Sequence, residues 1–213
     1  MGYRLTEIDR LTVEIRELNT RLGWRTGDNT FGDYVALLHS EVSEMVEAYR
    51  DHNLTDATPT ERAPVWRDTD PPVLLGWKPN KPEGVGSEVA DVAIRLLDMA
   101  DVFGYAIDRE TIRSWRGDYR LVTSLRTFGD YCAYLHLRIS YVLEAYLYRT
   151  VSDSVPGDMS FGLTVTLSSL EQMCETFDLD LESEVARKMA YNATRPYRHG
   201  RGTLATARSE LGA

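Results

Sequence analysis

Residues 30–49 read TFGDYVALLHSEVSEMVEAY, and residues 127–146 read TFGDYCAYLHLRISYVLEAY. Twelve of the twenty aligned positions are identical, at a constant offset of 97 residues. Self-similarity of this kind indicates a duplicated structural unit. In the first stretch, apolar residues recur at steps of three and four, which is the periodicity of a helix with one buried face. The pair therefore predicts two equivalent long helices and, with them, two related helical units.

The rest of the chain also reads as helices joined by loops. The apolar spacing predicts helices over 5–22, 31–51, 87–102, 128–149, 160–176 and 181–194, and the start of another near residue 108. Almost nothing alternates with the period of two that marks β-strands. We therefore predict an all-α fold, a helical bundle in which a first repeat (1–118) and a degenerate second repeat (119–200) pack as a pseudo-dimer.

Two segments fall outside this helical pattern. Residues 52–86 hold six of the eight prolines together with Trp66 and Trp77, and they read as a long ordered loop inserted into the first repeat. Loops of this length in compact domains are usually functional or mobile. Residues 201–213 are mostly small and polar, which predicts a disordered tail.

Composition narrows the classes of protein and partner. The 213 residues are 43% hydrophobic and 27% charged, as in an ordinary globular protein. A net charge of −9 disfavours a nucleic-acid polymer as partner and suits divalent cations. We expect a cytoplasmic protein with no membrane partner, because neither an 18-residue apolar window nor a secretory signal is evident. Cys132 and Cys174 are expected to be buried, reduced thiols.

The two copies differ in their acidic residues. In the first copy, Glu41 and Glu44 are three residues apart on one predicted helix, and Glu88 and Asp91 on the next, whereas the second copy has no such pairs at the corresponding positions. Residues i and i+3 share a helix face, so two facing helices would gather four carboxylates. Mg²⁺ or Mn²⁺ would relieve their repulsion and commonly shares its ligands with substrate phosphates. The pattern predicts a metal site for a phosphorylated ligand; the alternative is a solvated acidic face.

Neighbouring charged residues rank below these four. Glu47 continues the first acidic face, but Glu144 stands at its equivalent position in the second copy. A glutamate that is present in both copies is explained equally well by a structural role as by metal binding. Arg95 and Asp98 continue the second acidic face. A supporting role behind the metal ligands is open to them, but we favour an exposed structural role.

The last predicted helix carries a complementary basic set of Lys188, Asn192 and Arg195. Lysine neutralises phosphate oxygens, asparagine hydrogen-bonds phosphate or sugar, and arginine binds phosphate bidentately. The alternative is that these residues stabilise a helix C-terminus. Aligning Phe177 with Phe103 leaves the first copy without this set. The acidic half lies in one copy and the basic half in the other, which predicts one composite site per chain.

The ordered pattern ExxE…ExxD followed by KxxxNxxR resembles the all-α nucleoside triphosphate pyrophosphohydrolases, the superfamily of MazG-like enzymes, dimeric dUTPases and dCTP pyrophosphatases. The stretches KPEGVGSEVADVAIRLLD (81–98) and KMAYNATRPYRHG (188–200) look most like its MazG-like branch. The resemblance covers roughly residues 5–200, and implies two tandem MazG-like repeats fused into a pseudo-dimer. The chain departs from the family in the 43 residues that separate Glu44 from Glu88, and in the division of its motifs between two copies.

The resemblance implies a hydrolase of nucleotide metabolism that converts a (d)NTP and water into a (d)NMP and pyrophosphate. Mg²⁺ would be its cofactor, with Mn²⁺ as a substitute. The family's metal-binding and catalytic carboxylates correspond to Glu41, Glu44, Glu88 and Asp91. The substrate-binding set corresponds to Lys188, Asn192, Arg195 and Trp24. Trp24 matches an aromatic residue that the family places near the base, the alternative being a core or hinge tryptophan.

Two other functions stay open from the sequence. A non-catalytic nucleotide-binding or regulatory module would use the same scaffold, because loss of half a site can extend to loss of catalysis. A structural helical interaction protein would carry the acidic pairs as solvated faces. The pseudo-dimer either stands alone or forms a homodimer.

Overall fold

The computed structural model describes residues 4–25, 27–51, 82–108, 124–151 and 159–197. Within these ranges all regular secondary structure is helical, so the predicted all-α class is confirmed. In chain order the helices are α1 (Ile8–Arg21), α2 (Phe31–Arg50), α4 (Val85–Val102), α7 (Phe128–Val151), α8 (Met159–Thr176) and α9 (Leu181–Ala193). Their ends fall within three residues of the predicted ones.

Three predicted features lie outside the described residues. They are most of the loop at 52–86, the helix expected to start near residue 108, and the tail from residue 201. The described helices include none that is both long enough and apolar enough to cross a membrane.

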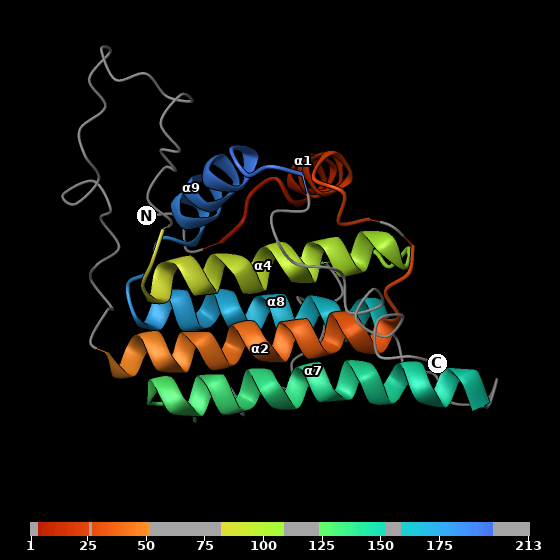
Figure 1. Ribbon diagram of the computed structural model, residues 1–213. Helices are drawn as coiled ribbons and strands as arrows, with labels where there is room; N and C mark the ends of the chain where they lie inside the picture. Colours follow the sequence, from red (N-terminus) through yellow and green to blue (C-terminus); the bar gives the residue numbers. More distant parts are fainter. Residues whose placement is uncertain (1–3, 26, 52–81, 109–123, 152–158, 198–213) are drawn as a thin grey trace, which may run out of the picture.

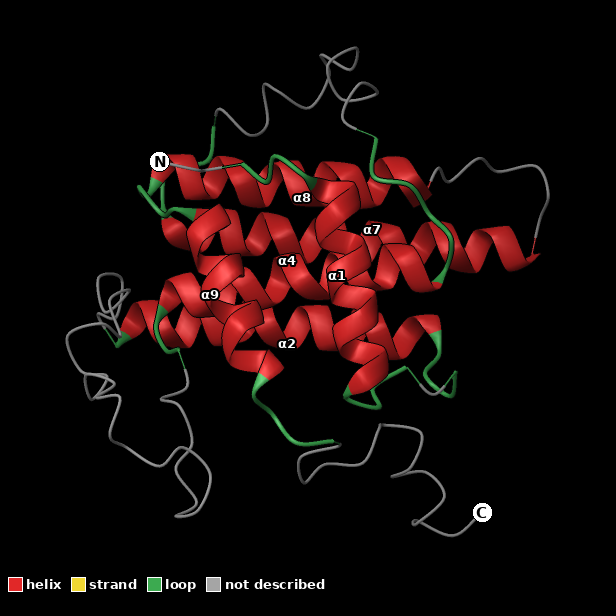
Figure 2. Ribbon diagram, turned by 90° about the horizontal axis from the view of Figure 1, so that it is seen from above, coloured by secondary structure: helices red, strands yellow, loops and turns green. Residues whose placement is uncertain are grey.

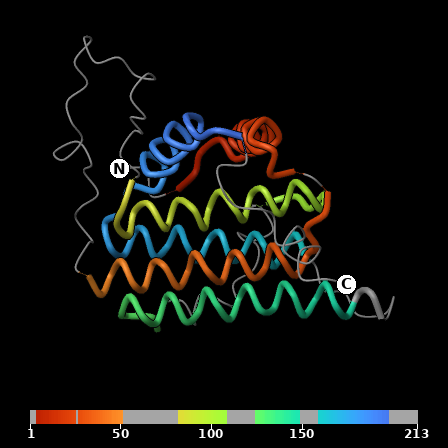
Figure 3. Tube along the Cα trace, in the orientation of Figure 1, coloured from red at the N-terminus to blue at the C-terminus, as the bar shows by residue number. Residues whose placement is uncertain are grey.

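Four long helices form the body of the bundle. α2 packs against both α4 and α7, α7 packs against α8, and α8 contacts α4. Figure 1 shows these four running side by side, with α1 and α9 crossing on the outer side of α4. The view from above shows the same crossing (Figure 2). The chain trace in Figure 3 shows that α9, the last of the described helices, returns to pack on α4 from the first half of the chain.

The two TFGD sequences begin their helices in the same way. Thr30 and Asp33 form a capping box, in which Asp33 N–H donates to Thr30 Oγ1 at 3.2 Å and Thr30 N–H donates to the Asp33 carboxylate at 2.8 Å. Thr127 and Asp130 make the same two bonds, at 3.1 and 2.9 Å. These caps satisfy backbone donors that an α-helix leaves unpaired, and they fix both starts at a phenylalanine.

Equivalent aromatic residues of the two copies meet where α2 packs on α7. Phe31 stacks on Tyr146 with ring centroids 4.0 Å apart, and Tyr49 stacks on Phe128 at 4.2 Å. Adding 97 to the numbers of Phe31 and Tyr49 gives Phe128 and Tyr146. Each stack therefore joins a phenylalanine of one sequence copy to a tyrosine of the other, at equivalent positions.

The second pair of helices repeats this correspondence. α4 and α8 are both 18 residues long. Each is followed by a phenylalanine that packs edge-on against the first residue of its neighbouring long helix: Phe103 against Phe31 at 5.0 Å, and Phe177 against Phe128 at 5.3 Å. Edge-to-face packing of this kind adds to the stability that burial alone provides.

Both cysteines lie inside the bundle as free thiols, as expected. Burial raises the pKa of Cys132 to about 12 and also raises that of Cys174. Neutral, buried thiols of this kind are poor nucleophiles and act as small apolar side chains.

A histidine pair stands at the middle of the α2–α7 contact. His39 Nδ1 lies 2.8 Å from His136 Nδ1, and the two rings are nearly parallel with centroids 5.0 Å apart. One neutral ring donates and the other accepts at such a distance. Burial lowers the pKa of both histidines, and the charge of His136 lowers the pKa of His39 further.

We expect this pair to make the bundle sensitive to mild acid. Because the folded-state pKa values lie below the ordinary value of about 6.5, the unfolded chain binds more protons below that pH. The pair's contribution to stability is therefore complete above pH ~6.5 and is lost as the pH falls, by at most about 1.4 kcal/mol per pH unit for each histidine. Urea denaturation between pH 7.5 and 5.0 measures it. The double variant His39→Gln/His136→Gln should have a flatter pH profile, and equal slopes in the two proteins would contradict the assignment.

Candidate functional site

Three of the four predicted carboxylates converge. Oxygen atoms from Glu41, Glu88 and Asp91 all lie within 4.8 Å of one another. Glu41 comes from the middle of α2, and Glu88 and Asp91 come from the first two turns of α4. Glu41 and Glu88 are buried and Asp91 is partly so. Oxygens on opposite sides of one hard cation are about 4–5 Å apart, so this carboxylate trio is the right size for a single divalent ion.

Glu44 stays outside the trio. Its side chain is exposed and accepts a hydrogen bond from the Ser40 hydroxyl at 3.3 Å. A step of three residues rotates a side chain by about 60° around the helix. Glu41 faces α4, and the same rotation turns Glu44 toward the rim of the site. The structure thus brings together three of the predicted ligands and leaves the fourth beside them.

Lys188 supplies a buried positive charge to the trio from α9. Its Nζ lies 2.5 Å from Asp91 Oδ2 and donates to Ser87 Oγ at 2.7 Å. Only 1% of the side chain is exposed. The Ser87 hydroxyl in turn donates to the Pro82 carbonyl at 2.8 Å, so the ammonium is held from two sides. Sequence reasoning missed Ser87, which belongs to no motif.

α9 lies close to α4 at a glycine. A methyl group on Gly86 would lie 2.6 Å from Cδ of Glu184, closer than real Cβ contacts allow. Glu184 is itself buried and bound by Arg187. A side chain at position 86 would therefore force the end of the Glu184 side chain to move.

A second cation, Arg95, binds the trio from the other side. Its Nε donates to Glu41 Oε1, and 39% of the arginine side chain is exposed. Burial raises the pKa of Glu41; Arg95 opposes this shift, while the charges of Asp91 and Glu44 add to it. The net rise in pKa, caused mainly by burial, means that Glu41 holds a proton more readily than a free glutamate does.

The expectation of an exposed role is wrong for Asp98. This residue is 7% exposed and accepts a hydrogen bond from Arg25 Nε at 2.9 Å. Arg25 also binds Asp101 at 2.6 Å. The turn after α1 reaches across the outer side of α4, a long-range contact that helix periodicity does not reveal.

The other two predicted substrate-binding residues of this motif, Asn192 and Arg195, lie further along the same segment as Lys188. Asn192 is one turn further along α9, and its buried Oδ1 has no hydrogen-bond partner among the described residues. Arg195 follows the end of α9, with its guanidinium 5.0 Å from the Tyr191 ring centroid. Neither residue makes a hydrogen bond or ion pair to the trio within the described part of the chain.

Trp24 is half-buried in the turn after α1, where its backbone N–H donates to the Asn19 backbone carbonyl at 2.9 Å. The preceding Gly23 packs directly under the Tyr197 ring. The turn that carries Trp24 therefore touches the segment that carries Arg195, on the side of α4 crossed by α1 and α9 (Figure 2). No sequence signal joined these two segments.

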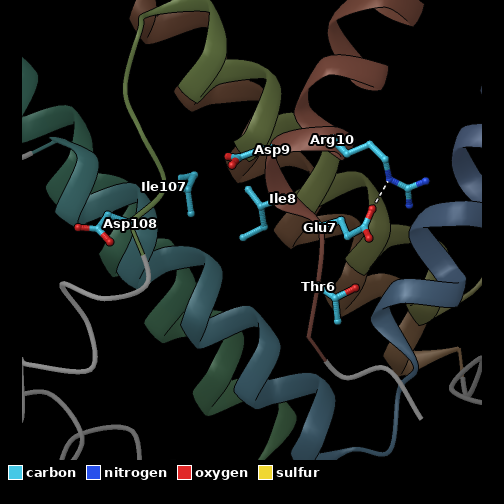
Figure 4. Close-up of a pocket in the computed structure, with 7 residues that line it drawn as sticks. All are labelled: Thr6, Glu7, Ile8, Asp9, Arg10, Ile107 and Asp108. Carbon is cyan, nitrogen blue, oxygen red and sulfur yellow. Dashed lines mark ion pairs between the residues drawn. The ribbon is translucent and has the colours of Figure 1, made fainter.

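A separate hollow of about 440 Å³ lies between the start of α1 and the chain after α4 (Figure 4). It is lined by Thr6, Glu7, Ile8, Asp9, Arg10, Ile107 and Asp108. It shares no residue with the trio or with the basic set, and we assign it no role in the site.

Comparisons with known proteins leave the family open: no family model matches the chain, and no curated protein or solved structure matches it. The motif set and the geometry of the carboxylate trio are therefore the observations from which a function can be inferred.

The variant Lys188→Met tests whether the ammonium is needed in the fold. Removing one partner of a buried ion pair typically costs about 3–5 kcal/mol, and the partial exposure of Asp91 should reduce this to about 3 kcal/mol. Adding Asp91→Asn should restore more than half of the loss, because the stranded carboxylate is then neutral. Urea denaturation in EDTA measures both variants. Arg10→Met, at an exposed pair, is the matched control and should change stability by about 0.5 kcal/mol or less. A loss below about 1 kcal/mol for Lys188→Met would contradict the buried pair.

Proposed function

We propose that this protein is a Mg²⁺-dependent nucleoside triphosphate pyrophosphohydrolase with one composite site per chain. The reaction adds water to a (d)NTP and yields a (d)NMP and pyrophosphate. The observation that carries the proposal is the contact between Lys188 and Asp91, which joins the basic motif of the second copy to the carboxylates of the first. The motif set that resembles the all-α pyrophosphohydrolases supplies the reaction class.

The donor set suits the proposed cofactor. Glu41, Glu88 and Asp91 offer only carboxylate oxygens, which are the ligands that Mg²⁺ and Mn²⁺ prefer. A bound ion would supply charge neutralisation of the phosphates and a water molecule of lowered pKa. With three carboxylates as its protein ligands, such an ion could also bind water and phosphate oxygens.

The chain's own side chains have distinct parts in this proposal. Lys188, fixed by Asp91 and Ser87, keeps a positive charge beside the carboxylates and stabilises negative charge that develops on the phosphates. Glu44, exposed at the rim and one turn from Glu41, is placed to accept a proton from the attacking water as general base. Asn192 and Arg195, on the same segment, extend the basic surface toward phosphate and sugar.

We also propose that the two halves are tandem repeats related by a local two-fold axis. The reciprocal stacks of Phe31 on Tyr146 and of Tyr49 on Phe128 support this, as do the matched caps. In the second repeat, the offset of 97 residues puts Arg138 at the position of Glu41. The alignment of Phe103 with Phe177 puts Gly162 and Val165 at the positions of Glu88 and Asp91. None of these is a metal ligand, so the repeat arrangement limits the chain to one site.

A non-catalytic nucleotide-binding module is the second candidate. The observation that favours it is the pairing of Lys188 with Asp91 and of Arg95 with Glu41, which largely neutralises the trio without a metal. Such a module would bind a nucleotide without hydrolysing it.

Pyrophosphate release separates the two candidates. The purified protein with Mg²⁺ should release pyrophosphate from at least one of the (d)NTPs, canonical or damaged. Glu41→Gln and Glu88→Gln should each lower the rate by roughly 100-fold or more, because each removes a ligand oxygen. Circular dichroism should show unchanged helix content.

Glu47→Gln is the matched control, since it lies on the same face of α2 and should retain activity. No pyrophosphate from any nucleotide tested, or full activity in Glu41→Gln, would refute the proposed reaction. Tight nucleotide binding without release would favour the non-catalytic module.

A further inference from the structure

The two cations at the trio are held in very different ways. Lys188 has 1% of its side chain exposed and contacts both Asp91 and Ser87. Arg95 has 39% of its side chain exposed, and within the described residues its hydrogen bonds and ion pairs are confined to Glu41. Lys188 is therefore fixed in the contact between α4 and α9, whereas Arg95 reaches in from solvent through one bond.

The two cations compete with a metal ion for the same carboxylates. The trio and the two cations sum to −1, and Glu44 at the rim brings the sum to −2, so the cluster with a divalent ion would be near neutral while Lys188 and Arg95 stay in place. Arg95 Nε also occupies Glu41 Oε1, which leaves that oxygen less available as a ligand. Lys188 cannot leave without exposing a buried pair, so Arg95 is the cation that can move.

We propose that Arg95 is a displaceable counter-ion, which neutralises Glu41 in the metal-free protein and passes to a substrate phosphate when the divalent ion binds. This inference rests on the proposed function of the same site. It makes Arg95 a further substrate-binding residue, although the sequence alone favours a structural role for it.

The position and chemistry of Arg95 suit both partners. It lies four residues after Asp91 on α4, so it shares the face of the helix that carries the metal ligands. Its guanidinium presents a planar fork of donors that fits either a carboxylate or a phosphate. Once released from Glu41, its partly exposed side chain would be open to a phosphate from solvent. Metal and phosphate binding would then be coupled positively, because the metal frees the arginine that the phosphate uses.

The variant Arg95→Gln separates the two roles of this side chain. Without the competing cation, the affinity for Mn²⁺ alone, measured by electron paramagnetic resonance, should rise by about tenfold. Inorganic tripolyphosphate in saturating Mg²⁺, followed by calorimetry, should instead bind about tenfold more weakly. Arg95→Lys keeps the charge but lacks the fork, and should fall between the wild type and Arg95→Gln in both measurements.

Arg10→Gln is the control for a change in overall charge, since it removes one positive charge from an exposed pair at the hollow of Figure 4. Both affinities should stay within about twofold of the wild type in this control. An unchanged Mn²⁺ affinity in Arg95→Gln would overturn the counter-ion role, and unchanged tripolyphosphate affinity would overturn the transfer to phosphate.

Failure of the proposed function would look different. In that case the wild type would bind no Mn²⁺, or Glu88→Gln would bind it as well as the wild type does. If Mn²⁺ binding requires Glu88 but its affinity is unchanged in Arg95→Gln, the metal site is supported and only the counter-ion role of Arg95 is refuted.

Discussion

The Lys188 ammonium, buried between Asp91 and Ser87, is the interaction on which the rest of the site depends. A charged amine this deep in a protein is stable only when paired and hydrogen-bonded, because desolvation alone costs several kcal/mol. Conversely, three carboxylates whose oxygens lie within 4.8 Å repel one another unless positive charge is near. The two halves of the cluster therefore stabilise each other. Their meeting ties α9 to α4, and with it the end of the chain to its first half.

The contact between Lys188 and the carboxylates offers a physical reason why the two sequence copies differ in their charged residues. Matched caps, aromatic stacks between equivalent positions and equal lengths of α4 and α8 support the proposal of two units of the same construction. The charged residues differ because they meet across the structure: one unit presents oxygens and the other an ammonium. On the proposed function, duplication followed by division of one site between two units explains the pattern.

The sequence predicted the helices well because their signals are local. Apolar spacing and the TFGD caps act within a few residues, so the ends of α2 and α7 could be derived without knowing what they touch. The i, i+3 spacing also brought Glu88 and Asp91 correctly onto one face. It did not show that Glu44 lies outside the trio, because periodicity gives the relative angle of two side chains but not which of them faces the neighbouring helix.

Long-range ion pairs could not be predicted in the same way. Arg25 reaches Asp98 from the turn after α1, and Ser87 fixes Lys188 across 101 residues of sequence. Neither pairing leaves a periodic trace. In the sequence, Arg95 continues a charged face and favours a structural role, and its contact with Glu41 could not be derived from that spacing.

The proposed function requires one metal site per chain, with ligands from the first copy alone. Anomalous diffraction from crystals soaked in Mn²⁺ tests this requirement. We expect a peak bounded by Glu41, Glu88 and Asp91, with metal–oxygen distances of about 2.0–2.3 Å, and no peak near Arg138, Gly162 and Val165. A metal bound elsewhere, or none between these three carboxylates at a saturating concentration, would contradict it.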